Sequence, residues 1–289
     1  MDLFEKFTYI NASGKSIIMD QIESAYFLET VSGLNGLKNS IFTMRTAGQD
    51  GETSVGSALE KRPVTLSGAI VENDLANRAN MIRVFTPKGK GVLTYEFGEI
   101  RRAIDCEVET LPTFADGEDG YMRFFIGLLC TNPYMRDQNE TRVDVAAWLP
   151  LLEFDDLEFP EGGIEVEARS LSLLVNVVNE GHVPAGMRVV FKASGTLENP
   201  SIQNINTYEE IRLNTTMLAG DEITVTTGYR NKKVTRKRGG VVSNLFSAFD
   251  VDSVFMQLAP GDNVLRYMAE ENVDALTVTV FHSNAYLGV

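Results

Sequence analysis

The stretch LAGDEITVTTGYRNKKV, residues 218–234, determines the expected fold class. In EITVTTGY (222–229), β-branched residues recur at the period of two that a strand requires. A second strand-like run, KKVTRKR, follows Arg230-Asn231, and Asn tolerates the left-handed conformation of a tight turn. The pattern predicts a β-hairpin with its turn at Arg230-Asn231 and a candidate bulge at Gly228.

The second strand of this hairpin concentrates the positive charge of the chain. Between residues 230 and 238 six side chains are basic and none is acidic: Arg230, Lys232, Lys233, Arg236, Lys237 and Arg238. The whole chain has 26 Lys and Arg against 40 Asp and Glu, a formal net charge of −14. This negative field disfavours nucleic acid, because phosphate contacts supply most of that affinity, and only Tyr229 offers a stacking ring nearby. We therefore expect a solvated hairpin that protects a sheet edge or docks an acidic protein partner. Nucleic-acid binding stays open as an alternative.

The rest of the chain reads mostly as strands. The runs 171–178, 187–194, 253–258 and 275–281 alternate apolar and polar residues, and turn-rich segments separate them. Short strands at this spacing favour an antiparallel β-sandwich over a parallel α/β sheet. One segment, NDLANRANMIRVFTP (73–87), has helical periodicity and predicts a helix over 74–86. Its expected buried face consists of Leu75, Ala79, Ile82 and Phe85.

Two domains are expected within the 289 residues. Strand-like runs at 61–70, 91–97, 100–111 and 121–130 surround the helix, and a break follows near Pro133, which disfavours helix before it. The predicted fold is mainly β. It has an N-terminal β-rich domain over 1–133, a linking or covering segment over 134–170, and a C-terminal antiparallel sandwich over 171–289.

The composition also indicates the cellular compartment in which the protein is made. No apolar run approaches the ~18 residues of a membrane span, and MDLFEKFTYI at the N-terminus lacks the features of a signal peptide. We expect a protein made in the cytoplasm that does not enter a membrane. Cys106 and Cys130 have no metal-ligand spacing and lie in apolar strand-like runs, so they are predicted to be buried free thiols.

Catalytic patterns are scarce. His182 lies in a Pro/Gly turn and His282 ends a strand, and the sequence has no G-x-S-x-G, H-E-x-x-H or Walker motif. FADGEDG (114–120) lacks the distal Glu of an EF-hand and is expected to be a solvated turn. In EFDDLEF (153–159) neighbouring carboxylates on an extended chain point to opposite faces, so an acidic exposed linker is expected. The prediction is no enzyme, no cofactor and no metal.

Several turns of the C-terminal half resemble those of siphophage distal tail proteins. In that family an Asn-Pro precedes a strand, a Gly-Asp opens a strand, and a hairpin containing Lys-Val follows. A hydrophobic-x-Leu-x-Pro-Gly-x-Asn turn comes next, and the last strand ends in aromatic-x-Gly. The corresponding residues, in the same order, are Asn199-Pro200, Gly220-Asp221, Lys233-Val234, Leu258, Pro260-Gly261, Asn263 and Tyr286-Leu287-Gly288. Residues 1–133 fit the family's strand-rich N-terminal domain with one helix, whereas 134–170 depart from the pattern.

The resemblance implies a virion component at the tail tip, assembled in the host cytoplasm. It implies a homohexameric ring of N-terminal domains, joined to the tail-tube protein on one side and to the tail-tip hub, or tail-associated protein, on the other. The C-terminal domains would be galectin-like sandwiches that project outward and in some cases dock receptor-binding proteins. DNA would only pass through the channel, where acidic copies repel its phosphates.

Two other classes of function stay open from the sequence. A galectin-like sandwich also suits a carbohydrate-binding module that helps attachment to the host surface. However, the single tryptophan, Trp148, lies in AAWLPLL, which is typical of packing rather than of an exposed sugar platform. A hydrolytic enzyme is the remaining alternative.

Overall fold

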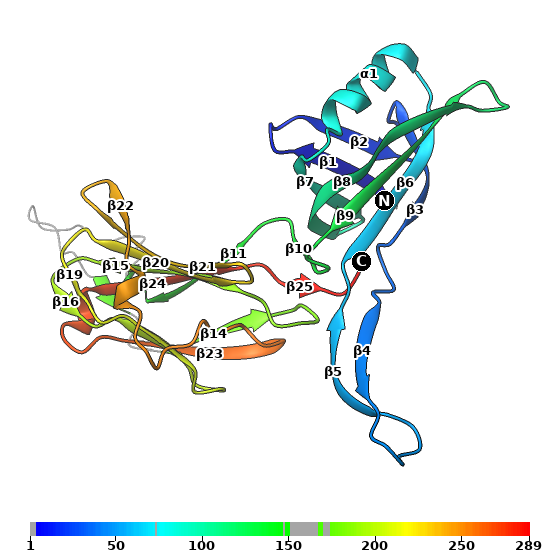
Figure 1. Cartoon of the computed structure of the whole chain (residues 1–289). Coiled ribbons are helices and arrows are strands. Elements are labelled where there is room, and N and C mark those ends of the chain that lie inside the picture. Colours follow the sequence, from blue (N-terminus) through cyan, green and yellow to red (C-terminus); the bar gives the residue numbers. More distant parts are fainter. Residues whose placement is uncertain (1–3, 73, 147, 151–166, 170–173) are drawn as a thin grey trace, which may run out of the picture. The chain divides into compact units, whose positions relative to one another are not determined.

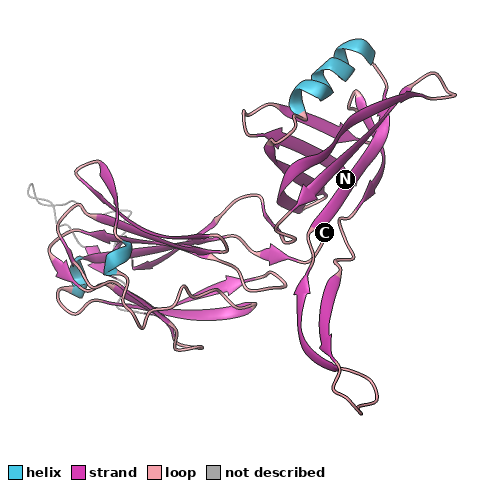
Figure 2. Cartoon of the chain, viewed as in Figure 1, coloured by secondary structure: helices cyan, strands magenta, loops and turns pink. Residues whose placement is uncertain are grey.

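The computed structural model describes residues 4–72, 74–146, 148–150, 167–169 and 174–289. It is mainly β, with one α-helix in the described part of the chain, and the predicted fold class is confirmed (Figures 1 and 2). The chain forms two compact units. The first is Met1–Gln138 together with Ala285–Val289, and the second is Asn139–Asn284. Within the described segments no helix has both the length and the apolar character needed to cross a membrane.

The first unit is a β-barrel with an appended helix and hairpin. The main sheet has the order β25-β10-β8-β7-β1-β2-β3-β6-β9, and β8 also pairs with β9, which closes the run from β8 to β9 into a barrel. Its pairings are antiparallel except for a short parallel contact of β2 with β3. The elements are β1 Lys6–Asn11, β2 Ser16–Asp20, β3 Tyr26–Ser32, β4 Asn39–Met44, β5 Thr53–Leu59, β6 Arg62–Ile70, α1 Asp74–Val84, β7 Lys90–Phe97, β8 Ile100–Asp116, β9 Met122–Cys130, β10 Met135–Asp137 and β25 Ala285–Tyr286.

Alternation along the strands builds the barrel interior. In β1 the buried Phe7 and Tyr9 alternate with side chains that face outward, as a period of two requires. Closure of the barrel is short at one seam, because β2 meets β3 only at Asp20 and Phe27. Cys106 and Cys130 are free thiols buried in the same core, so that prediction is confirmed.

Helix α1 covers one part of the barrel through its C-terminal end. It packs against β2, β6 and β8, and its buried side chains are Met81 and Val84, followed by Phe85 just beyond the helix. The ring of Phe85 stacks on that of Tyr9, with 4.3 Å between the centroids. The predicted helix is confirmed, although it ends at Val84 rather than at residue 86.

The predicted buried face of α1 is largely wrong. Leu75 is 79% exposed, Ile82 is 51% exposed and Ala79 is also exposed, and only Phe85 of the expected face lies in the core. Met81, Val84 and Phe85 have the i, i+3, i+4 spacing of a competing stripe. That stripe contacts the barrel, so the helix turns Leu75 and Ile82 towards solvent.

The second unit is an antiparallel β-sandwich. One sheet has the order β11-β24-β15-β20-β21-β22 and the other has the order β14-β23-β17-β18; β12 pairs with β13 and β16 with β19. One apolar cluster, which includes Val177, Phe191, Ile202 and Tyr267, joins the two sheets. The elements are β11 Thr141–Ala146, β12 Trp148–Pro150, β13 Glu167–Arg169, β14 Leu174–Asn179, β15 Met187–Ala193, β16 Leu197–Glu198, β17 Ser201–Asn204, β18 Glu210–Arg212, β19 Thr216–Met217, β20 Glu222–Gly228, β21 Asn231–Arg238, β22 Val241–Asn244, β23 Gly261–Met268 and β24 Leu276–His282, with 3₁₀ turns η1 Phe246–Ala248 and η2 Val273–Ala275.

Most of the strands predicted in this unit are present. The runs 187–194, 222–229 and 275–281 correspond to β15, β20 and β24, and the described part of 171–178 belongs to β14. The strand expected at 253–258 is wrong, because Leu258 alone forms a bridge, to Ala185. In this segment a side chain bonds to the neighbouring backbone where strand pairing was expected. Gln257 donates an Nε2 hydrogen to Thr227 O at 2.6 Å.

The division of the chain differs from the predicted one in two respects. Residues 135–137 form β10 in the first sheet and 141–146 form β11 in the second unit, so the described part of 134–146 is not a free linker. Residues 285–289 return to the first unit instead of ending the sandwich. The covering segment expected further along, including EFDDLEF (153–159), lies outside the described residues.

Candidate interaction surfaces

The turn residues taken from the family pattern hold the sandwich together. Asn263 is buried; its Nδ2 donates to Ala259 O at 2.8 Å and to Gly261 O at 3.0 Å, and its Oδ1 accepts Ala259 N at 2.9 Å. Gly261 has φ +88°, a conformation that favours glycine. These bonds fix the Pro260-Gly261 turn at the start of β23, so Asn263 is a structural residue.

A second motif turn places a carboxylate beside the basic strand. Gly220, at φ +86°, donates its N–H to Ala193 O at 2.8 Å. Asp221 is almost fully buried and accepts Leu218 N at 2.9 Å, which closes the turn. Arg238 holds the same carboxylate through both of its oxygens, with Nε to Oδ1 at 2.6 Å. The hydrogen bond from Arg238 holds the pKa of Asp221 below its usual range.

The other two motif turns lie in different units. Asn199 has φ +49° and donates its N–H to Thr215 O at 3.0 Å, and Pro200 follows it into β17 of the sandwich. Gly288 belongs to the first unit, where an added Cβ would collide with the Asn35 side chain. The motif turns therefore do not form one site.

The basic hairpin exists as predicted, with its turn displaced by one residue. β20 and β21 pair continuously up to Gly228 opposite Asn231, so the two-residue turn is Tyr229-Arg230 and Gly228 forms no bulge. Arg230 takes the left-handed conformation, with φ +57°. Asn231, expected in the turn, instead begins β21.

The structure divides the six basic side chains among different environments. Val234 is buried, so the alternating residues of β21 on its face are Lys232, Arg236 and Arg238, while Lys233 and Lys237 occupy the opposite face and Arg230 the turn. Arg238 is engaged with Asp221. The Nε of Arg236 is buried and has no hydrogen-bond partner among the described residues. The exposed cations available to a partner are therefore chiefly Arg230, Lys232, Lys233 and Lys237.

The predicted sheet edge at β21 is present along only part of the strand, because β22 covers Thr235–Arg238 and no described strand pairs with the outer side of Asn231–Lys233. β22, Val241–Asn244, pairs with β21 on its outer side, so β22 is the edge strand of that sheet. All four residues of β22 are exposed, among them Val241 and Val242. Arg236, Lys237 and Arg238 therefore lie one strand inside the edge, whereas Lys232 and Lys233 lie on the part of β21 that β22 does not cover.

Aromatic rings that the sequence separates from the basic strand lie beside it in the structure. The ammonium of Lys232 is 5.4 Å from the ring centroid of Phe255, which stacks on Phe249 at 4.3 Å. Phe246 packs on both rings and is half exposed. No regular sequence pattern indicates this contact, because the rings lie in η1 and in the irregular segment that follows it.

A second surface was not anticipated from the sequence. β4 and β5 form a separate two-stranded hairpin that extends from the end of the β3–β6 pair (Figure 1). Every residue of both strands is exposed except Ser40 and Leu59, which are half-buried. Neither strand contains a charged residue, yet Ile41, Phe42, Met44 and Val55 are all more than half exposed. The sequence signal was the lack of charge in both strands, which alternation alone does not reveal.

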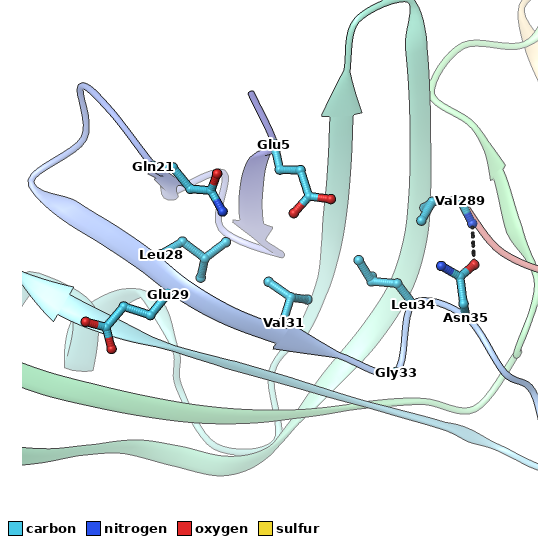
Figure 3. Close-up of a pocket in the computed structure, with 9 residues that line it drawn as sticks. All are labelled: Glu5, Gln21, Leu28, Glu29, Val31, Gly33, Leu34, Asn35 and Val289. Carbon is cyan, nitrogen blue, oxygen red and sulfur yellow. Dashed lines mark hydrogen bonds between the residues drawn. The ribbon is translucent and has the colours of Figure 1, made fainter. Parts of the chain in front are cut away.

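The first unit also contains a pocket of about 330 Å³ (Figure 3). Its lining residues are Glu5, Gln21, Leu28, Glu29, Val31, Gly33, Leu34, Asn35 and Val289. Asn35 Oδ1 accepts Val289 N at 3.2 Å at its rim. The lining includes no histidine, cysteine or hydroxyl nucleophile, and one of its two carboxylates, Glu29, is paired with Arg123.

The candidate catalytic and metal-binding residues do not come together in one site. His182 is exposed in a turn, and His282 is buried at the end of β24. FADGEDG lies at the β8–β9 connection, where Asp119 pairs with Arg123. In the part of the chain that the structure describes, no three His, Cys, Asp or Glu residues are arranged to hold a metal ion.

Comparison with known proteins identifies the class. Residues 180–286 match the family model of the siphovirus-type tail component, C-terminal domain. No curated protein matches the chain significantly. The predicted resemblance to siphophage distal tail proteins is confirmed. The alternative of a carbohydrate-binding module is not favoured.

Solved structures share the fold over the whole chain. The SPP1 Dit protein, described as a paradigm of hub adsorption apparatus in phages that infect Gram-positive bacteria, matches with a TM-score of 0.68 and 15% identity over 97% of this chain and 99% of its own. A chain of the phage p2 baseplate in its activated conformation with Ca matches with a TM-score of 0.57 and 10% identity over 100% of both chains. The same baseplate with Sr gives a TM-score of 0.56 and 10% identity over 99% of both.

Proposed function

We propose that this chain is the ring-shaped adaptor that joins the distal end of the tail tube to the tail-tip hub and the receptor-binding apparatus. The observation that carries the proposal is the match of residues 180–286 to the C-terminal domain of siphovirus-type tail components. The likeness of fold to SPP1 Dit and to the p2 baseplate chains supports the same role for the whole chain. The role is structural and involves no catalysis or cofactor.

The two units suit different parts of this role. The barrel of the first unit is a compact body, and copies of it suit a ring with a channel. The sandwich of the second unit suits an outward position, where its exposed surface is available to hub or receptor-binding proteins. Copies of a chain with a net charge of −14 would repel DNA phosphates, which fits a channel through which DNA passes without sticking.

The exposed part of the basic strand is the proposed dock for an acidic partner. Lys232, Lys233, Lys237 and Arg230 are accessible, and the half-exposed Phe246 adds an apolar contact close to Lys232. A charged rim beside an aromatic group is typical of protein interfaces. Nucleic acid is disfavoured here by the overall negative charge.

Negative-stain imaging of the purified full chain tests the proposal. We expect rings with six-fold symmetry and a central hole, either alone or after addition of the tail-tube protein. A monomer at high concentration that binds neither the tail-tube protein nor the hub protein would contradict the adaptor role.

A further inference from the structure

Two buried thiols face each other where β8 and β9 close the barrel. The two strands pair with Glu107 opposite Leu129, so the next residue on each strand, Cys106 on β8 and Cys130 on β9, continues the same register. Both belong to the apolar core of the first unit, and their side chains are hydrogen-bonded to each other. The structure therefore brings together the only two cysteines of the chain.

The spacing of the two positions suits a covalent bond. Residues directly opposite each other in an antiparallel pair have Cα atoms about 4.5–5.5 Å apart. This separation lies within the range of about 4.4–6.8 Å that a disulfide spans. Both side chains also point into the same core, so their Cβ atoms lie on one face of the sheet. The two sulfur atoms can bond without separating the strands.

The surroundings of the pair make its two thiols unequal. Arg62 on β6 lies opposite Cys130 and is buried with it. The hydrogen bond from Cys106 lowers the pKa of Cys130 against the effect of burial, and the positive charge of Arg62 acts in the same direction. The same hydrogen bond, together with burial, raises the pKa of Cys106. Cys130 is therefore the thiol that supplies the nucleophilic thiolate, and Cys106 keeps its proton.

A buried hydroxyl without a hydrogen-bond partner among the described residues lies beside the pair. Gly91 on β7 is opposite Cys106, whose Sγ is 3.7 Å from Gly91 O. A Cβ added at Gly91 would meet the Tyr9 hydroxyl at 2.5 Å, and that hydroxyl is the unpartnered group. Burial and the neighbouring Cys106 raise the pKa of Tyr9 to about 12, so it stays a proton-bearing donor at neutral pH. It can donate to an oxygen atom that is bound to one of the sulfurs.

We propose that Cys106 and Cys130 form a reversible disulfide when the protein meets a hydroperoxide, and that this bond locks the barrel at the β8–β9 seam. The Cys130 sulfur attacks one peroxide oxygen, the O–O bond breaks, and the leaving hydroxide takes the Cys130 proton to become water. The Cys106 sulfur then attacks the sulfenic sulfur, the S–O bond breaks, and the oxygen leaves as a second water with the Cys106 proton. Two thiols lose two electrons and hydrogen peroxide is reduced to two waters. This inference does not depend on the proposed adaptor function.

The bond would reinforce an irregular part of the barrel. The β8–β9 pairing shifts register twice, between Val108 and Thr110 and between Thr110 and Thr113, and the cysteine pair lies at the end of that ladder. A disulfide there restricts the unfolded chain between the two cysteines. Thiols stay reduced in the cytoplasm and disulfides persist outside it, so the protein would gain stability on leaving a reducing compartment.

Peroxide treatment of the folded full chain tests whether the bond forms. The reduced protein is treated with hydrogen peroxide, denatured and alkylated, and its peptides are mapped by mass spectrometry without reduction. We expect a linked pair of peptides that contain Cys106 and Cys130, with the mass of two hydrogens lost, and expect dithiothreitol to reverse the link. Two alkylated thiols after treatment, or sulfinic acid without a link, would overturn the proposal. Tyr9→Phe should give the same link several-fold more slowly, and an equal rate would remove the hydroxyl from the reaction.

Unfolding of the same samples tests whether the bond locks the barrel. The oxidised wild type should melt roughly 5 °C above the reduced wild type, with an unfolding equilibrium constant about tenfold lower or more. Cys130→Ala is the matched control: it lacks the nucleophile, so treated and untreated samples should melt alike. If that variant does not fold, the return of the oxidised wild type to the lower melting temperature on reduction serves as the control. An equal or lower melting temperature after complete linkage would refute the lock.

Discussion

Arg62 shows how one residue ties together parts of the first unit that lie far apart in the sequence. Its guanidinium is buried and donates to Pro133 O at 2.8 Å, to Gly33 O at 2.9 Å, to Leu287 O at 2.7 Å and to Leu34 O. Burial lowers the pKa of Arg62, although the side chain stays protonated. The rigid fork of donors lets one side chain satisfy four carbonyls from three segments. In the sequence, Arg62 is only a polar residue at the start of a strand.

We expect Arg62→Met to destabilise the first unit by about 3 kcal/mol or more. Methionine fills similar space but leaves several buried carbonyls without donors, and each unsatisfied group costs about 1–3 kcal/mol. Urea unfolding followed by fluorescence or circular dichroism measures the change. Arg62→Lys is the matched control and should recover part of the loss, because an ammonium keeps the charge but cannot reach all four oxygens. An unchanged unfolding midpoint in the methionine variant would refute the structural role.

Asp221 makes the stability of the sandwich depend on pH. Its folded pKa lies below the ordinary unfolded value of about 3.9, because Arg238 and the Leu218 N–H bond the carboxylate. This contribution is fully present above about pH 4 and is lost as the pH falls through the folded pKa. We expect Asp221→Asn to cost about 2 kcal/mol at neutral pH and to flatten the loss of stability as the pH falls below about 4.

Unfolding curves of both proteins at several pH values check the prediction. Hydrogen bonds also lower the pKa of Asp20 and Asp250, so the wild type should lose stability in acid at more than one site. Only the difference between wild type and variant isolates Asp221. Asp252→Asn, at an exposed position of the same unit, is the control and should follow the wild type. Parallel curves for all three proteins would contradict the role of the buried pair.

At the scale of elements, the sequence pattern predicted where the strands lie better than it predicted which face of an element is buried. The period of two located β15, β20 and β24, because each has a buried face and a less buried one. The same reasoning misjudged α1, whose apolar residues form two stripes, of which only one meets the barrel. It also overlooked the β4–β5 hairpin, because its two strands do not alternate regularly between apolar and polar side chains and nearly all of their residues are exposed.

Removal of charge from the exposed part of β21 should leave the fold and the ring intact. In the variant, Arg230, Lys232, Lys233 and Lys237 become Ser. Arg236 and Arg238 are kept because one has a buried Nε and the other holds Asp221. We expect unchanged melting and unchanged rings in negative stain, with weaker binding to an acidic tail-tip protein in pull-down assays at low salt. Arg238→Ser alone is the contrasting control and should lower the melting temperature of the sandwich. Loss of the ring in the four-residue variant would place the hairpin at the ring interface instead.

At the scale of the whole molecule, the sequence predicted the two-part β organisation but not how the first unit is completed. Closure of the barrel depends on β8 and β9, whose pairing has register shifts near Thr110 that a regular alternation does not reveal. The return of residues 285–289 depends on contacts with β10 that lie far away in the sequence. The C-terminal motif turns indicated the family without separating Gly288 from the other turns, because a short turn motif does not specify which unit it joins.

The first unit is built from both ends of the chain, whereas the second is one continuous segment. Fragments of the two units should therefore differ in whether they fold fully alone. Residues 139–284 form a complete unit, so this fragment should fold alone. Residues 1–138 lack β25, the ring of Tyr286 that lies 3.5 Å from the guanidinium carbon of Arg102, and the Leu287 carbonyl bound by Arg62. A short Gly-Ser linker from residue 138 to residue 285 restores these contacts, since Arg136 and Ala285 are paired neighbours. We expect the linked fragment to melt roughly 5–10 °C above 1–138 alone in scanning calorimetry. Equal melting temperatures would mean that the returning strand contributes nothing to the barrel.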